Sequence, residues 1–109
     1  MLRKDLNNSF KLSALTGIKK SVLDEIYCYA QDNALEKAVL FGSRSRGEQK
    51  RSSDIDLAVL GGNIDKFKSD VEEKTSTLLR FDVVDLSVVS NSELLNEIKR
   101  DGITLYEKV

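Results

Sequence analysis

Several residue types on which common active sites and structural frameworks depend are scarce or missing in this chain. It has one cysteine, Cys28, and no histidine, which excludes a disulfide framework and the usual ligand sets of zinc. Any bound metal ion must therefore be held by oxygen. Cys28 also lacks a histidine that would activate it as a nucleophile, so we expect it to be a small buried filler.

Long hydrophobic runs and an excess of one charge are lacking too. No apolar stretch approaches the roughly 18 residues of a membrane span, and the first residues do not resemble a signal peptide. The 17 basic and 18 acidic side chains nearly cancel, to a net charge of −1, so no broad field attracts nucleic acid or a membrane surface. We therefore expect a cytoplasmic protein without direct nucleic-acid binding and without a membrane partner.

The chain does contain enough apolar residues for one core. Hydrophobic residues make up 40% of its 109 residues and charged residues 32%, a balance typical of a small globular domain. We expect a single domain over residues 1–109, in which residues 1–16 are a lead-in segment.

The apolar pattern predicts helices and strands that alternate along the chain. Asn63 is a candidate N-cap for a helix whose apolar face extends to Leu78, and Ser90 with Glu93 has the spacing of a capping box. The predicted elements are a helix over 18–33, a strand over 38–41, a polar segment over 43–53, a strand over 55–59, a helix capped at 63, a strand over 81–89, a helix capped at 90 that ends at Gly102, and a strand over 103–106. This order predicts an α+β fold with a mixed β-sheet flanked by helices.

The first candidate site lies at Gly42 and Ser43, where the strand over 38–41 ends. Glycine allows the backbone to approach an anion closely, the Ser43 hydroxyl can donate a hydrogen bond, and a short helix beginning here would favour negative charge. The pattern fits a phosphate-binding turn. Taken alone it more often marks an ordinary turn, so it needs support from other residues.

Carboxylates in the next two strands supply that support. Asp54 and Asp56 are two residues apart in a strand-like stretch, so both side chains point to one face, about 7 Å apart. Two like charges in this arrangement are unfavourable without a cation, and Mg²⁺ prefers such oxygen ligands. Asp82 and Asp85 are three residues apart and must face opposite ways, so only one of them joins the pair. We prefer Asp82, which lies nearer the strand start, although parity alone leaves Asp85 open.

The turn and three carboxylates together are the parts of a two-metal phosphoryl-transfer site. Metal ions roughly 4 Å apart would bridge the carboxylates and the phosphates of a nucleoside triphosphate. One ion would activate an attacking hydroxyl and the other would stabilise the leaving pyrophosphate. Asp82 would then be placed to accept the proton of the hydroxyl.

Gly42-Ser43, ten intervening residues and Asp54-x-Asp56 follow one another without a gap. This order resembles the signature of the polymerase-β-like nucleotidyltransferase superfamily. Within it, the stretches LFGSRSRG and SDIDLAVL look like the minimal nucleotidyltransferases, and the strand with Asp82 is similar to the third carboxylate motif. The resemblance covers residues 35–109 and implies the polymerase-β-like nucleotidyltransferase fold.

The resemblance also implies roles for individual residues. It places Mg²⁺, as two ions, at the catalytic carboxylates Asp54, Asp56 and Asp82, and it makes ATP the substrate. The triphosphate would be bound by residues of the LFGSRSRG stretch, namely Gly42, Ser43, Arg44 and Arg46. Both arginines could instead belong to a solvated loop, and of the two we favour Arg46 for the phosphates.

A protein partner is implied as well. Minimal members resembling this chain are often encoded beside a small helical HEPN protein, a ribonuclease toxin. They act as its antitoxin by moving AMP from ATP to a toxin tyrosine, which implies a hetero-oligomer. Larger relatives have an extra domain for the acceptor, so we expect a second protein to supply that surface here. Candidates for the contact are Phe10, Leu12, Tyr27 and Tyr29, unless they pack in the core.

Two other functions stay open from the sequence. The chain could bind nucleotide without turnover and neutralise its partner by covering it, or it could transfer the nucleotide to a small molecule such as an antibiotic. A complete carboxylate set favours an enzyme over a masking protein, and the expected lack of an acceptor domain counts against a small-molecule substrate.

Overall fold

The fold consists of four helices and four strands within residues 6–109, the part of the chain that the computed structural model describes. The helices are α1 (Leu6–Thr16), α2 (Lys20–Asp32), α3 (Ile64–Lys74) and α4 (Ser92–Asp101), and the strands are β1 (Lys37–Phe41), β2 (Ile55–Leu60), β3 (Phe81–Asp85) and β4 (Ile103–Glu107). None of these helices is long and apolar enough to cross a bilayer.

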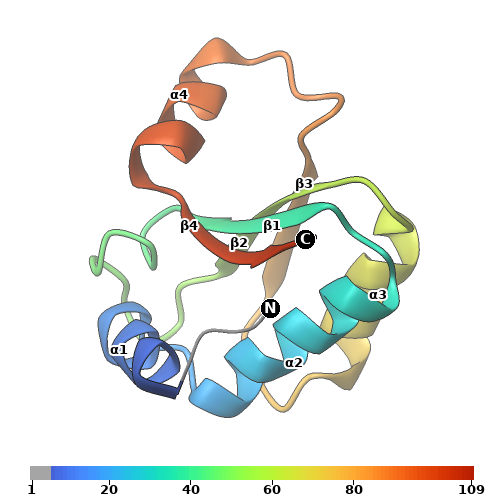
Figure 1. Cartoon of the computed structure of the whole chain (residues 1–109). Helices are drawn as coiled ribbons and strands as arrows, with labels where there is room; N and C mark the ends of the chain where they lie inside the picture. Colours follow the sequence, from blue (N-terminus) through green and yellow to red (C-terminus); the bar gives the residue numbers. More distant parts are fainter. Residues whose placement is uncertain (1–5) are drawn as a thin grey trace.

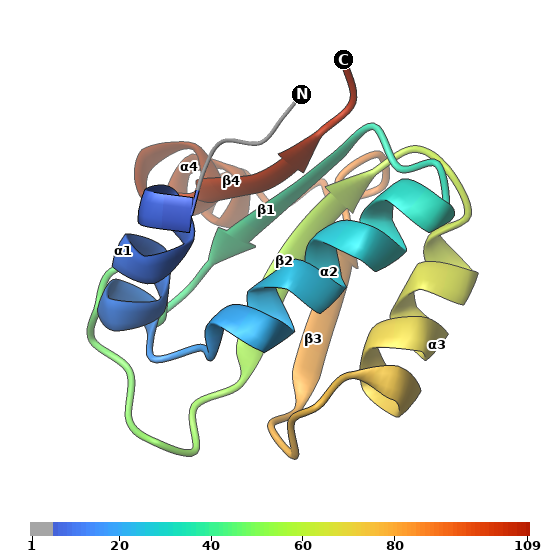
Figure 2. The ribbon, with the colours of Figure 1, turned by 60° about the horizontal axis from the view of Figure 1, so that its bottom comes forward.

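The strands form one mixed sheet in the order β3-β2-β1-β4 (Figure 2). β1 runs antiparallel to β2 and to β4, whereas β2 and β3 are parallel. A parallel pair needs a crossover connection, and α3 supplies it. The predicted α+β fold with a mixed sheet flanked by helices is therefore confirmed.

Helices cover both faces of the sheet, because apolar side chains of the strands alternate between the faces (Figure 1). On one face, α2 and α3 bury Ile26 and Phe67 completely against strand residues such as Leu40. On the other face, Ile98 of α4 packs in a second cluster with Val39, Phe41 and Ala58. The two apolar clusters hold β1 and β2 between the helices, and the candidate site lies next to the end of β1.

The N-terminal segment contains a helix that the apolar pattern did not predict, and Cys28 differs from its prediction. Most of the predicted lead-in segment forms helix α1, and residues 1–5 lie outside the described part. Cys28 is exposed, so its prediction as a buried filler was wrong. It lies two residues from both Ile26 and Ala30 on α2, and therefore points away from the face that these residues bury.

Two predicted elements are shorter in the structure. α3 ends at Lys74, so Leu78 is not part of its apolar face and is fully exposed. β3 ends at Asp85, because the Asp85 carboxylate accepts hydrogen bonds from the Ser87 amide at 2.9 Å and the Ser87 hydroxyl at 2.7 Å and turns the chain. The predicted bounds were too long because they followed the apolar residues alone, and these continue into the turns.

The helix ends are set mainly by asparagine and glycine. α4 is capped by Asn91 rather than by the predicted Ser90, since the Asn91 side chain accepts a hydrogen bond from the Leu94 amide at 3.1 Å. Asn63 caps α3 and Gly102 ends α4, as predicted.

Asp70 joins α3 to the end of α2. This carboxylate is only 4% exposed, and it accepts hydrogen bonds from Asn33 at 3.0 Å and from Lys66 at 2.9 Å, with Lys74 at 3.2 Å. The contacts from Asn33 and Lys66 lower the pKa of Asp70 to about 2. Because the folded pKa lies below the unfolded one, these contacts stabilise the fold above about pH 4, and their contribution is lost as the pH falls from about 4 to about 2.

We expect the substitution Asp70→Asn to remove this pH-dependent stability. The free energy of unfolding, measured by urea denaturation, should differ most between wild type and variant above pH 5, and the difference should shrink toward pH 2. Asp65→Asn, an exposed acid on the same helix, is the matched control and should change the free energy of unfolding by less than about 0.5 kcal/mol. A difference for Asp70→Asn that is the same at pH 2 and pH 7 would contradict this account.

Candidate active site

The turn after β1 is built around Gly42. Its φ of +80° lies in the left-handed region, and a Cβ here would collide with the Asp56 carboxylate, so both the backbone and the available space require glycine. The Gly42 carbonyl accepts hydrogen bonds from the Ser45 amide at 3.2 Å and the Ser45 hydroxyl at 2.8 Å. Residues 43–47 therefore form turns rather than the start of a helix. The Ser43 hydroxyl makes no hydrogen bond within the described residues and is available to a ligand.

Strand register brings Asp56 and Asp82 together. In the parallel pair of β2 and β3, Asp56 lies opposite Asp82, about 5 Å away at the backbone, with both side chains on the face that carries α4. Asp54 comes one residue before β2 and has the same parity as Asp56. Asp85 lies at the far end of β3, opposite Val59. Of the two alternatives left by the sequence, the geometry therefore places Asp82 beside Asp56.

Negative charge is crowded at this end of the sheet, where β2 and β3 begin and β1 ends. The pKa of Asp56 is raised from 3.8 to about 6, first by burial and then by the charges of Asp82, Asp54 and Glu97, while Arg44 acts in the opposite direction. Within the described part of the chain, the carboxylates of Asp54, Asp56 and Asp82 have no hydrogen bond or ion pair. The carboxylates are thus left without a cation of the protein's own.

The raised pKa of Asp56 lowers the stability of the fold. Asp56 ionises near pH 4 in the unfolded chain but only near pH 6 in the folded one, so the free energy of unfolding falls between about pH 4 and pH 6. Above about pH 6 the free energy of unfolding is lowered by the full amount. A cation at this edge would offset it.

The donor set fits Mg²⁺, which prefers carboxylate oxygen. No three acidic side chains of residues 6–109 are gathered closely enough to hold an ion by themselves. Mg²⁺ usually takes one or two carboxylates, waters and substrate phosphates rather than a cage made by the protein alone. Asp56 and Asp82 in register, with the Gly42 turn beside them, suit that mode of binding.

Arg44, which we expected at the nucleotide, is bonded to the protein's own backbone. The residue is 2% exposed, and its guanidinium donates hydrogen bonds to the carbonyls of Thr16 at 2.8 Å, Ser53 at 3.0 Å, Arg51 at 3.2 Å and Lys50 at 3.5 Å. These carbonyls belong to the end of α1 and to the loop that leads into β2. Arg44 therefore holds the loop before the carboxylates against α1.

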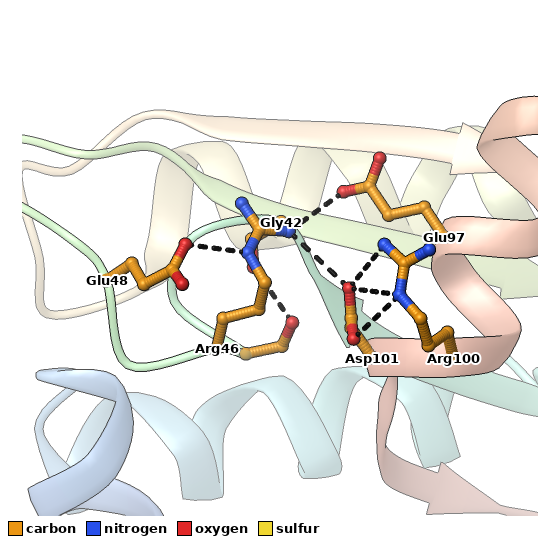
Figure 3. A network of polar contacts seen from close by, with 7 residues as sticks. Gly42, Arg46, Glu48, Glu97, Arg100 and Asp101 are labelled. Carbon is orange, nitrogen blue, oxygen red and sulfur yellow. Dashed lines mark hydrogen bonds and ion pairs between the residues drawn. The ribbon is translucent and has the colours of Figure 1, made fainter.

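Arg46 lies in the same turn as Ser43, to whose carbonyl its amide donates a hydrogen bond at 3.2 Å. Its guanidinium donates to Glu48 at 2.9 Å and to Glu97 of α4 at 3.2 Å, and Asp101 is 3.7 Å away (Figure 3). The hydrogen bonds to Glu48, and after it to Glu97, raise the pKa of Arg46. Glu97 could not be found from the sequence, because it lies 51 residues from Arg46 and resembles any acid on a solvated helix face.

Comparison with known families matches residues 24–109 to the family "Polymerase beta, Nucleotidyltransferase". The chain belongs to this family. The match includes the Gly42 turn, the three aspartates and α4, and it begins within α2, so α1 lies outside it. The family resemblance and the fold predicted from the sequence are both confirmed.

Among known proteins, this chain is similar to a proposed protein adenylyltransferase, MJ0604, of Methanocaldococcus jannaschii. The two are 36% identical over 63 residues. The match covers 58% of this chain and 61% of the length of that relative.

Solved structures are similar as well. A toxin–antitoxin crystal structure with AMP-PNP is 29% identical with a TM-score of 0.63, over 79% of this chain and 73% of that chain. A mutant of the toxin–antitoxin MntA-HpeT is 27% identical with a TM-score of 0.62, over the same shares of 79% and 73%. A structure from Shewanella oneidensis, 21% identical with a TM-score of 0.57 over 84% of this chain and 74% of that one, shares the fold. The predicted likeness to an antitoxin of the minimal nucleotidyltransferase type is thereby confirmed.

We expect Arg44→Met to destabilise the protein by about 3 kcal/mol, because it leaves four backbone carbonyls without their donor. Arg51→Met is the matched control: the Arg51 side chain is exposed on the same loop, and this variant should lose less than about 0.5 kcal/mol. Urea denaturation measures both. Equal effects of the two substitutions would contradict the role that the contacts give Arg44.

Proposed function

We propose that this chain transfers AMP from ATP to a hydroxyl group. The observation that supports the proposal most directly is the register of Asp56 and Asp82, two carboxylates without ion-pair partners in the described chain, next to the Gly42 turn. Crowded carboxylates beside a turn that requires glycine suit the binding of a polyphosphate with its cation. Membership of the nucleotidyltransferase family supports the same chemistry.

The reaction would begin with the acceptor hydroxyl placed next to the carboxylates. Its oxygen attacks the α-phosphorus of ATP, and its proton passes to a carboxylate, for which Asp82 on the exposed side of β3 is best placed. The bond from the α-phosphorus to the oxygen of the β-phosphate breaks, and pyrophosphate leaves. The acceptor then carries AMP through a phosphodiester bond.

Residues around the carboxylates would bind and orient the nucleotide. Gly42 and Ser43 would contact the triphosphate, with the Ser43 hydroxyl as donor, and Arg46 would neutralise phosphate charge. Asp54, Asp56 and Asp82 would hold two Mg²⁺ ions, which supply charge neutralisation at the attacking and leaving oxygens. Arg44 would act on this site through the loop that it holds rather than by direct contact with phosphate.

We further propose that the acceptor is a tyrosine of a HEPN ribonuclease toxin, and that the chain is the antitoxin in a cytoplasmic hetero-oligomer with it. The similar proteins support this, since one is named as a protein adenylyltransferase and others are toxin–antitoxin structures, one of them with AMP-PNP. Of the side chains considered for the partner contact, Phe10 is 59% exposed, whereas Leu12, Tyr27 and Tyr29 pack partly against the core. Phe10 on α1 is thus the best placed of the four.

The proposal predicts transfer of the α-phosphate, and of no other, to one host protein. The purified chain, with Mg²⁺ and a lysate of its own host, is incubated with ATP labelled on the α- or on the γ-phosphate. We expect a discrete protein band that takes up the α-label alone, and phosphodiesterase should release it as AMP. Mass spectrometry should locate the modification on tyrosine.

The double variant Asp54→Asn/Asp56→Asn should give no labelled band, while Asp65→Asn, an exposed acid on α3 outside the site, should label like wild type. Uptake of the γ-label would indicate phosphoryl transfer and contradict the proposal. If the chain binds a partner that never becomes labelled, the chain acts by masking. Label found in a small molecule instead would point to a small-molecule acceptor.

A further inference from the structure

The last turns of α4 reach the Gly42–Ser43 turn through Arg46. The Arg46 amide is bonded to the Ser43 carbonyl, and its guanidinium lies between Glu48 of its own turn and two carboxylates of α4, Glu97 and Asp101 (Figure 3). The α4 contacts bridge segments far apart in the sequence. They therefore fix the position of the turn relative to a helix.

α4 is a rigid support for this contact. Ile98, next to Glu97, is 7% exposed in the cluster with Val39, and the Gly102 amide donates to the Ile98 carbonyl at 2.8 Å. A Cβ at Gly102 would lie 2.6 Å from the Val39 side chain, so the end of α4 is pressed closely on β1. Since the Gly42 turn begins where β1 ends, Glu97 is fixed relative to that turn.

Glu97 is the principal α4 partner of Arg46. The Glu97 carboxylate is 3.2 Å from Nη1 of Arg46, whereas Asp101 is 3.7 Å away and is already bonded by the Arg100 guanidinium at 2.9 Å and 3.2 Å. Glu48 is exposed and belongs to the same turn, so it moves with Arg46 and cannot fix its position on the sheet.

Arg46 keeps hydrogen-bond donors free for a ligand. A guanidinium has five N–H donors, and the contacts above use Nε and Nη1. Nη2 has no hydrogen bond or ion pair within the described residues. A guanidinium fixed on one side and open on the other is well suited to bind phosphate oxygens.

We propose that Glu97 is a positioning residue of the nucleotide site: from α4 it holds the Arg46 guanidinium beside the Gly42–Ser43 turn, so that the Nη2 donors meet the phosphates. This inference rests on the proposed function and extends it, because it assigns to a helix acid the placement of the cation that binds the triphosphate. Glu97 itself would not contact the nucleotide.

Charge alone predicts the opposite effect for Glu97. Its carboxylate is near enough to the three aspartates to raise the pKa of Asp56, so it adds negative charge to a site for an anionic ligand. Removing this charge should tighten the binding of a triphosphate if Glu97 acts only through its field. Removing it should weaken binding if Glu97 positions Arg46. The sign of the change therefore distinguishes the two.

The test measures the Kd of AMP-PNP and of AMP, with Mg²⁺, by calorimetry on the full chain. The variants are Glu97→Ala, Arg46→Ala and the double variant, with Glu93→Ala, an exposed acid in the first turn of α4, as the matched control. We expect Glu97→Ala to weaken AMP-PNP binding about tenfold and AMP binding less than about twofold. Glu97→Gln, which keeps one acceptor oxygen, should lie between wild type and Glu97→Ala.

The double variant should bind AMP-PNP no more weakly than Arg46→Ala alone, because Glu97 acts through Arg46. Thermal unfolding of each variant shows that a change in Kd is not a loss of fold. Unchanged or tighter AMP-PNP binding by Glu97→Ala, or additive effects in the double variant, would overturn the positioning role while leaving the proposed function intact. A folded wild-type chain that does not bind AMP-PNP would overturn both.

Discussion

Like charges on neighbouring strands repel one another, yet the register of β2 and β3 sets Asp56 directly beside Asp82. Backbone hydrogen bonds of the sheet fix this register, and the apolar faces on either side of it do not allow a slip by one residue. Asp54 adds a third charge just before β2. The sheet thus holds together an arrangement that the side chains alone would not adopt. The pKa of Asp56 is raised to about 6, first by burial and then by the charges of Asp82 and Asp54, and this rise lowers the stability of the folded state.

The surroundings of this edge keep the carboxylates in place without neutralising them. The Asp56 carboxylate occupies the space that a Cβ at position 42 would need. The Arg44 guanidinium donates its hydrogen bonds to backbone carbonyls rather than to the acids. Arg46 is drawn toward α4 by Glu97. Arg44 and Arg46 therefore both have partners within the protein, which leaves the carboxylates, the Ser43 hydroxyl and Nη2 of Arg46 open to a ligand with its own cation.

Features that depend on residues close together in the sequence could be predicted, whereas contacts between residues far apart in the sequence could not. The carboxylate spacing, the Gly42 turn and the Asn63 cap follow from a few adjacent residues, and the structure has them where the pattern placed them. The contacts of Arg44 could not be predicted, because Thr16 lies 28 residues away at the end of α1 and the polar stretch over 50–53 resembles any solvated loop. Glu97 was missed because its partner Arg46 lies 51 residues away in the sequence. Cys28 was expected to be buried, but it lies between the buried Ile26 and Ala30 and so on the opposite side of α2.

The most direct measurement of the central claim compares the free energy of unfolding of wild type and Asp56→Asn at pH 7.5, with and without Mg²⁺ and AMP-PNP. A rise of the pKa to about 6 would correspond to about 3 kcal/mol for a carboxyl shielded from water, and solvent screening at this half-buried group leaves on the order of 1 kcal/mol. Without ligand the variant should be more stable than wild type by this smaller amount, on the order of 1 kcal/mol. With ligand at about 100 times its Kd, wild type should gain about 2.7 kcal/mol and become the more stable of the two. A variant that is never more stable without ligand, or a ligand that stabilises both equally, would contradict the claim that these carboxylates are kept unpaired for a nucleotide and its cation.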